Sequence, residues 1–259
     1  MPDGVPSLRW RDLPGLLWQG CFFFLRDLHR YLLCGMLLFG LPVGLATFLS
    51  TAVFRSGWIA AGVAVIVGLA VAWWPAVLTT GVQLRASGGA PELADLIEAV
   101  THHALALTGL AFIMAVVVAL GFLGVFALAT VITGMGLMAA VVGTILFVAF
   151  ALHAFLAAVA VTERIHAWPA WRRCCALSQG RRWQTVCLIG TSGLLGYGLF
   201  RVWLELGPER IAPDIMAWLN IPVVVLLLAL VAAIMGVLHQ RLRQIEERGS
   251  ARVLAAHFD

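Results

Sequence analysis

Lysine is absent from this chain of 259 residues, and all 17 of its basic residues are arginine. Charged residues make up only 12% of the chain, whereas a soluble domain has about 25%. So few charges cannot cover a surface of this size for contact with water. The hydrophobic fraction is 62%, against about 45–50% in soluble domains. These values exclude an ordinary soluble enzyme and a disordered chain, and they indicate a polytopic membrane protein.

Regular cysteine spacing is also missing. The five cysteines form no CxxC pair, and their odd number argues against a disulfide framework. The sequence therefore predicts neither a zinc ribbon nor a thioredoxin-like site. We interpret the cysteines as small apolar residues; they are Cys21, Cys34, the adjacent Cys174 and Cys175, and Cys187.

The motifs of common enzymes and nucleic-acid binders do not occur either. There is no phosphate-binding glycine loop, no nucleophile elbow and no zinc-protease helix. The apolar runs contain no Asp or Glu before Glu205, and ion-coupled transporters usually carry acids near the membrane midplane. We therefore expect a protein that is not an enzyme, has no cofactor or metal, and does not bind nucleic acid.

Long apolar runs are what the chain does have. A bilayer core of about 30 Å needs roughly 20 apolar residues per helix. Residues 104–162 contain no Asp, Glu or Arg and are too long for one span, so we expect a break near Thr133–Gly136. The sequence predicts an all-α transmembrane bundle of six spans, at about 31–54, 58–84, 104–131, 137–162, 184–204 and 215–239.

We expect one integral membrane domain over residues 1–259, with amphipathic helices on one surface of the membrane. In residues 1–30, apolar positions alternate with charge, which predicts an interfacial N-terminal helix. A second interfacial helix is expected from Pro91, because proline and early acids favour a first helical turn. Residues 240–259 are expected to form a tail.

The arginines also predict the orientation. Fourteen of the 17 fall on the side that holds both termini if there are six spans. By the positive-inside rule, that side is the cytoplasm. The abundance of arginine, alanine and glycine is typical of a GC-rich bacterial genome, so we expect a multi-pass protein of the bacterial inner membrane with both termini cytoplasmic.

The loop over residues 163–183 is the most informative segment. Pro169 and Gly180 delimit a short predicted helix in it. Planar arginine side chains bind phosphate well, and basic residues are attracted to an anionic leaflet. They could instead serve only as a topological anchor. The candidate lipid- or partner-binding residues are Arg172, Arg173, Arg181, Arg182, Trp171 and Trp183.

His153 is the one ionisable side chain deep within a predicted span. Such residues are functional candidates, but a neutral histidine can also serve as a packing hydrogen bond between helices. Two carboxylate–histidine pairs, Glu98 with His102 and Glu163 with His166, have helical spacing. Di-iron bundles need two Glu-x-x-His motifs and two further Glu, so one such motif at a helix end predicts no metal site.

Small residues recur at spacings that allow close helix packing. Gly190, Gly193 and Gly196 lie three apart in the fifth predicted span. Such ridges let helices approach closely in a membrane. They serve either packing within the bundle or contact with a partner subunit.

The layout over about residues 75–205 carries a resemblance. An acidic amphipathic helix and two long spans lead to the Glu163-Arg164 step, then a short helix, Gly180, and Trp183 at the start of the next span. This resembles uncharacterised bacterial six-helix membrane families that are similar to the membrane domain of some glycerophosphodiester phosphodiesterases. The catalytic domain is absent, so the resemblance implies a membrane-embedded accessory role and no catalytic residues.

We therefore expect a non-catalytic accessory or scaffolding subunit that packs with another membrane protein, or with itself, or organises anionic membrane lipids. The alternative is a permease or lipid-handling transport component that uses His153 and the arginine-rich loop. A membrane redox or metal-binding subunit is the third possibility.

Overall fold

A computed structural model describes residues 8–42, 44, 73–85, 92–129, 135–206 and 213–258. Helices are the only regular secondary structure in these ranges, which confirms the predicted all-α class. Within them, three helical stretches are long and apolar enough to cross a membrane, at Ala140–Glu163, Arg182–Leu206 and Leu219–Glu247. These three match the fourth, fifth and sixth predicted spans. Residues 43 and 45–54 of the first predicted span, and residues 58–72 of the second, lie outside the described residues.

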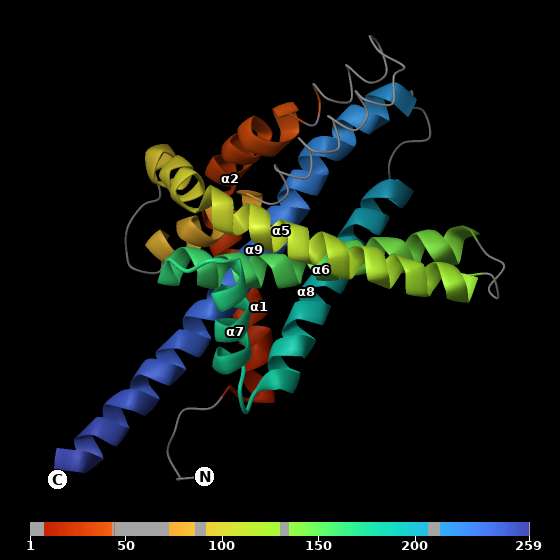
Figure 1. The fold of residues 1–259 in the computed structure, drawn as a ribbon. Coiled ribbons are helices and arrows are strands. Elements are labelled where there is room, and N and C mark those ends of the chain that lie inside the picture. The colour runs from red at the N-terminus through yellow and green to blue at the C-terminus, as the bar shows by residue number, and fades with distance from the viewer. Residues whose placement is uncertain are drawn as a thin grey trace.

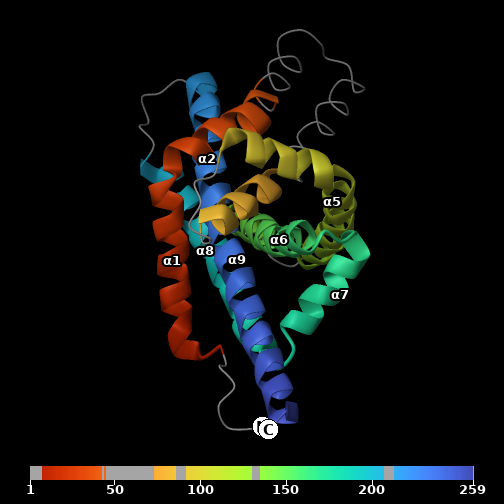
Figure 2. The ribbon, with the colours of Figure 1, turned by 90° about the vertical axis from the view of Figure 1, so that its left-hand side faces the viewer.

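The longest helix, α9 (Pro213–Phe258), is the axis of the fold. It runs through the whole molecule in Figures 1 and 2 and packs against α1, α2, α6, α7 and α8, defined below. A helix that is apolar on every face must be covered on every face. That is observed here, because nearly all side chains from Leu228 to His239 are buried. The helix continues without a break through most of the predicted tail.

The helices α5 (Leu93–Ala129) and α6 (Met135–Glu163) form an antiparallel pair that crosses in front of α9 (Figure 1). The structure has α5 end at Ala129 and α6 begin at Met135, so part of the predicted break at Thr133–Gly136 is the first turn of α6 and the rest lies outside the described residues. The acidic stretch after Pro91 does not form a helix of its own. It is the first part of α5, since the structure has one continuous helix where the sequence predicted two.

The N-terminal part of the chain lies along α9 in the opposite direction (Figure 2). It consists of a 3₁₀ turn η1 (Trp10–Asp12), α1 (Leu13–Arg26), α2 (Leu28–Gly35) and a π-helical turn η2 (Met36–Gly40). A side chain at Gly20 would collide with Ile234, and one at Gly35 would collide with Val225 and the Trp74 ring. The two glycines therefore permit this close approach.

The predicted N-terminal helix is present as α1. It buries the stripe Leu16, Gly20 and Phe24 and packs on α9, and its interfacial location stays a prediction. Its outer side is also apolar, since Trp18 is 74% exposed and Phe22 and Leu25 are exposed as well. A surface helix with apolar residues on both sides suits a lipid environment better than water.

The helix α8 (Arg182–Leu206) packs on α6 and α9. Gly193 lies directly on the backbone of Val148 in α6, and Gly196 lies against Phe147 and Val231. Gly190, the third glycine of the predicted ridge, faces open space. The ridge therefore serves packing within the bundle at two of its three positions.

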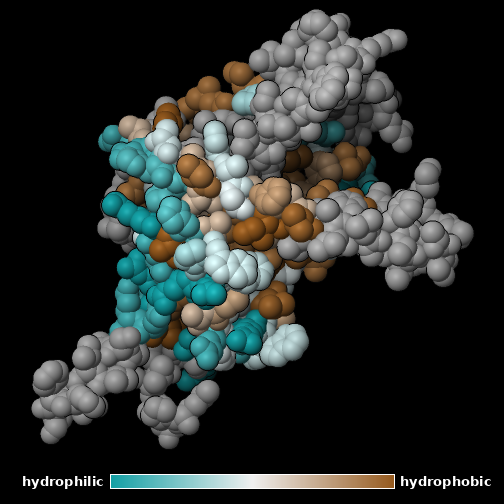
Figure 3. Space-filling model, in the orientation of Figure 1, coloured by the Kyte–Doolittle hydropathy of each residue, from teal (hydrophilic) through white to brown (hydrophobic). Residues whose placement is uncertain are grey.

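Large apolar side chains are exposed on several helices. Leu105 and Phe112 on α5 are 89% and 72% exposed, and Val186 and Leu194 on α8 are exposed too. In Figure 3, hydrophobic side chains spread across the middle of the face, where α5 and α6 lie. Hydrophilic side chains gather toward one side of that face. Exposed apolar surface of this kind marks contact with a membrane or a protein partner.

Candidate functional site

The arginine-rich loop forms a short helix, α7 (Ala167–Leu177), at the end of the molecule where α8 begins and α9 ends (Figure 1). The reversal after α6 uses Arg164, whose φ of 53° is unusual for a residue other than glycine. Pro169 lies in the first turn of α7 and Gly180, with φ of 78°, follows its end. The predicted helix is thus confirmed, with its start two residues before Pro169.

Arg173 on α7 is held between two carboxylates. Its Nε donates to the Oε1 and Oε2 atoms of Glu163 at 2.9 and 2.8 Å. Its Nη1 and Nη2 donate to the Oε1 and Oε2 atoms of Glu246 on α9 at 2.7 and 2.6 Å. These hydrogen bonds, with Glu246 the larger influence, raise the pKa of the Arg173 guanidinium. Arg173 therefore ties α6, α7 and α9 together and is occupied within the protein.

The other predicted arginines differ from Arg173. Arg172 is exposed, and its guanidinium carbon lies 5.8 Å from the centroid of the Trp168 ring, which is cation–π geometry. Arg182 is exposed at the first turn of α8, and Arg181 is half-buried beside it. Trp183 is 75% exposed. The structure therefore leaves Arg172, Arg181 and Arg182 near the surface at this end of the bundle.

An apolar groove of about 340 Å³ lies between α6, α7 and α8. Arg182 is its one charged lining residue, and Trp171 and Ser178 line it from α7. Thr185 also lines it; this residue is 4% exposed, and its buried hydroxyl has no hydrogen-bond partner among the described residues. The remaining lining residues are Leu152, Phe155, Leu156, Cys174, Cys175, Val186 and Ile189. We call this the α7 groove.

The polar and apolar parts of the α7 groove are separated along α8. Arg182 is the first residue of that helix, and Ile189 is seven residues further on, or about 10 Å along its axis. The groove thus has an exposed cation at the start of α8 and an apolar wall along the next two turns of that helix. An anionic amphiphile has this same order of polar and apolar parts.

His153 is separate from this groove. It is 4% exposed on α6 and does not line the α7 groove, although its neighbour Leu152 does. The sequence-based candidates therefore belong to two places, a buried histidine in α6 and the basic end of the bundle.

Metal-ligating residues do not gather in the described part of the chain, where no three His, Cys, Asp or Glu side chains come together. Glu163, from the Glu-x-x-His pair, is bonded to Arg173, and His166 precedes α7. Glu98 and His102 pair at 3.4 Å on the exposed side of α5. Cys174 is buried, and this burial raises the pKa of its thiol, which disfavours the reactive thiolate.

Sequence reasoning missed a buried ion pair on the other side of α9. Asp27, at the junction of α1 and α2, is 1% exposed and accepts a hydrogen bond from Arg85 Nε at 2.7 Å. Arg85 Nη2 also contacts the Asp27 carboxylate. Arg30 Nη1 lies 3.7 Å from Asp27 Oδ1. The hydrogen bonds from Arg85 lower the pKa of the Asp27 carboxyl. No local signal could have found a pair separated by 58 residues.

Glu246 and Thr185 were missed for a similar reason. Each looks like an ordinary helical residue in the sequence, and only the packing of α7 and α6 against its helix gives it a role. Comparisons with protein-family models, with curated proteins and with solved structures return no match for this chain.

Proposed function

We propose that this protein is a non-catalytic accessory protein of the bacterial inner membrane that binds and organises anionic lipid at the cytoplasmic surface. The observation that carries the proposal is the α7 groove, in which Arg182 precedes an apolar wall. A phosphate at the entrance would meet the Arg182 fork, and an acyl chain would lie against Leu152 and Ile189. No carboxylate lines the groove to oppose an anion.

The surroundings of the groove support the same role. Trp171 and the exposed Trp183 suit the headgroup layer, because tryptophan is enriched at membrane interfaces. Arg181 adds positive charge beside the entrance, and a basic residue near an anionic leaflet contributes on the order of 1 kcal/mol. Arg173 has a different role in this proposal. It holds α7 in place against α6 and α9, and α7 forms one side of the groove.

The test compares Arg182, which lines the α7 groove, with Arg172 on α7, which does not line it. We expect Arg182→Gln to retain at least about tenfold less anionic phospholipid after gentle solubilisation, because a charge-assisted hydrogen bond contributes about 1.5–3 kcal/mol. Arg172→Gln is the matched control, since Arg172 stacks on Trp168 and does not line the groove. The measurement is native mass spectrometry of the purified full-length chain.

Arg182→Lys separates a specific contact from simple anchoring. Lysine keeps the charge but cannot make the planar two-pronged contact with phosphate. We expect Arg182→Lys to insert normally and still lose lipid. Equal lipid retention in the wild type, Arg182→Gln and Arg172→Gln would contradict the proposed function.

The proposal includes six spans with both termini in the cytoplasm. The 14-to-3 distribution of arginine supports it, as does the grouping of α7, the start of α8 and the end of α9 at one end of the molecule (Figure 1). Reporter fusions after Asp259 and near residue 210 are expected to report cytoplasm and periplasm respectively. Two fusions that report the same side would show that the number of spans is wrong.

A further inference from the structure

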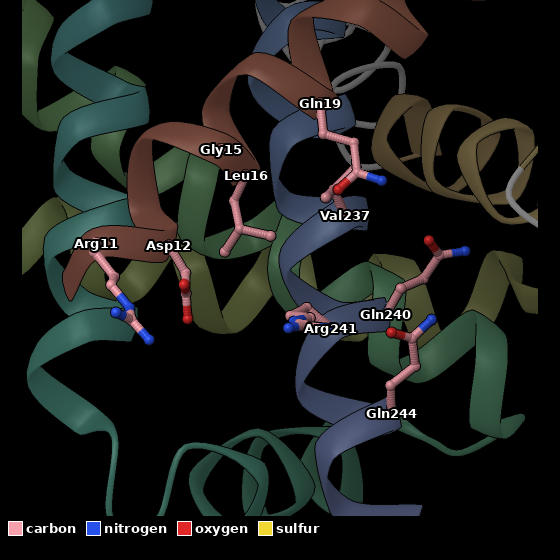
Figure 4. A pocket seen from close by; sticks show the side chains of 9 residues that line it. All are labelled: Arg11, Asp12, Gly15, Leu16, Gln19, Val237, Gln240, Arg241 and Gln244. Atoms are coloured by element: carbon pink, nitrogen blue, oxygen red, sulfur yellow. The ribbon is translucent and has the colours of Figure 1, made fainter. Parts of the chain in front are cut away.

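A second groove, of about 410 Å³, lies between the first turns of the N-terminal helices and α9 (Figure 4). It shares no lining residue with the α7 groove. Its walls are mainly polar, whereas the walls of the α7 groove are mainly apolar. This second groove therefore suits a polar ligand or the polar part of a lipid, whereas the α7 groove suits an apolar chain.

Glycine creates the space on the α1 side. A side chain at Gly15 would meet nothing within 4 Å, so this position leaves the groove open above the buried Leu16. On the other side, Val237 is buried in α9 and forms part of the apolar floor. The polar side chains that line the groove lie around Leu16 and Val237, as Figure 4 shows.

Two arginines and one aspartate supply the charge. Arg11 precedes α1, and Arg241 faces the groove from α9 (Figure 4). Among the described residues, neither arginine has a carboxylate partner. Asp12 Oδ2 accepts a hydrogen bond from the backbone N–H of Arg9 at 2.9 Å, so it already has a role in the turn. The groove thus carries one net positive charge, with two guanidinium groups free to bind an anion.

Three glutamines complete the lining, namely Gln19 on α1 and Gln240 and Gln244 on α9. A glutamine amide both donates and accepts hydrogen bonds, which matches the hydroxyl group, itself a donor and an acceptor. A guanidinium donates only and matches phosphate. This combination is selective for a ligand that carries hydroxyls next to a single negative charge.

We infer that this groove binds the headgroup of an anionic phosphodiester that carries free hydroxyls. The single negative charge of a phosphodiester balances the net charge of the site. The arginines hold its phosphate, and the glutamines hold the hydroxyls. A headgroup with a cationic ammonium is disfavoured, because it places a like charge beside Arg11 and Arg241. The ligand could be a membrane phospholipid or a soluble phosphate ester with the same headgroup chemistry.

The experiment measures thermal unfolding of the purified full chain in detergent, with three probes. These are phosphatidylglycerol, phosphatidylcholine and soluble glycerophosphoglycerol, which is the same phosphodiester headgroup without acyl chains. We expect phosphatidylglycerol to raise the unfolding midpoint and phosphatidylcholine to leave it unchanged. If glycerophosphoglycerol alone raises the midpoint equally, the ligand is a soluble ester. If only the lipid raises the midpoint, the ligand is a membrane phospholipid. Failure of both to raise it would overturn the inference.

Variants locate the effect in this groove. A Cβ atom at Gly15 would meet nothing within 4 Å, and leucine favours a helix over glycine, so Gly15→Leu should fold, occupy the groove and abolish the response. Arg11→Gln should weaken binding by at least about tenfold. Arg243→Gln is the matched control, because Arg243 pairs with Glu247 on the same helix and lies outside the groove. A response that survives in both Gly15→Leu and Arg11→Gln would overturn the inference.

The thermal response to phosphatidylglycerol is expected not to depend on the α7 groove. Arg182→Gln should leave the response to phosphatidylglycerol in this assay, whereas Gly15→Leu should remove it. If Arg182→Gln alone removes the response, the headgroup site belongs to the α7 groove and the inference fails while the proposed function stands.

Discussion

Replacing Arg85 by alanine is expected to destabilise the protein more than any other single charge removal in its described part. The change leaves the Asp27 carboxylate, which is 1% exposed, without its closest cation. Removing one partner of a buried ion pair generally costs about 3–5 kcal/mol, because the other charge stays buried and uncompensated. We expect a fall of several degrees or more in the thermal unfolding midpoint in detergent, together with lower yield.

A double variant separates the lost charge from lost packing. Asp27→Asn combined with Arg85→Met removes both charges and keeps much of the volume. Replacing a whole buried pair is often close to neutral. We therefore expect the double variant to recover most of the stability that Arg85→Ala loses. A double variant as unstable as Arg85→Ala would show that the lost stability does not come from an uncompensated Asp27 carboxylate.

The pH dependence gives a second measure of the same contact. The pKa of Asp27 is lowered in the folded state, so its contribution to stability is complete above the ordinary value of about 3.8. The contribution disappears as the pH falls through the lower, folded value. The wild type should lose this stability in strong acid. In Arg85→Ala, acid instead neutralises the unpaired Asp27 carboxylate. The difference in folding stability between the wild type and Arg85→Ala should therefore shrink below about pH 4.

Two glycine substitutions on α8 are expected to have opposite effects. A Cβ atom at Gly193 would lie 2.8 Å from the Cα of Val148 and 2.9 Å from its backbone nitrogen. Backbone cannot move aside as a flexible side chain can, so Gly193→Ala should force α6 and α8 apart. Overpacking of this kind typically costs about 1–3 kcal/mol.

Gly190→Ala is the matched control for Gly193→Ala. The two positions lie on the same helix, one turn apart, and a Cβ at Gly190 meets nothing within 4 Å. Alanine also favours helix over glycine by about 0.5–1 kcal/mol. Gly190→Ala should therefore be neutral or slightly stabilising in the same unfolding measurement. Equal destabilisation by both variants would argue against the close contact between α6 and α8.

Helix positions were the most predictable part of this molecule. The predicted spans at 184–204 and 215–239 lie within α8 and α9, and the Pro169–Gly180 helix corresponds to α7. These features depend on hydrophobic runs and on residues with special backbone conformations, which act over a few neighbouring positions. Composition alone was sufficient for the all-α class, because so apolar a chain must satisfy its backbone within helices when it lies in lipid.

The role of each charged residue depended on tertiary structure. The sequence grouped Arg172, Arg173, Arg181 and Arg182 as one set, yet only Arg173 is bound by Glu163 and Glu246. Which arginine turns inward depends on the direction in which α7 packs against α6 and α9. That direction results from contacts between helices that are distant in sequence, and it cannot be predicted from hydrophobic periodicity.

The helical class, the apolar spans at 137–162, 184–204 and 215–239, and the short basic helix α7 follow from the sequence alone. The packing of α1 along α9, the contact of Asp27 with Arg85, and the grooves at Arg182 and Gly15 depend on how the helices come together. The physical reason is the range of the interactions. Caps, glycines and apolar runs act within a turn or two of helix, whereas an ion pair or a groove exists only where separate helices meet.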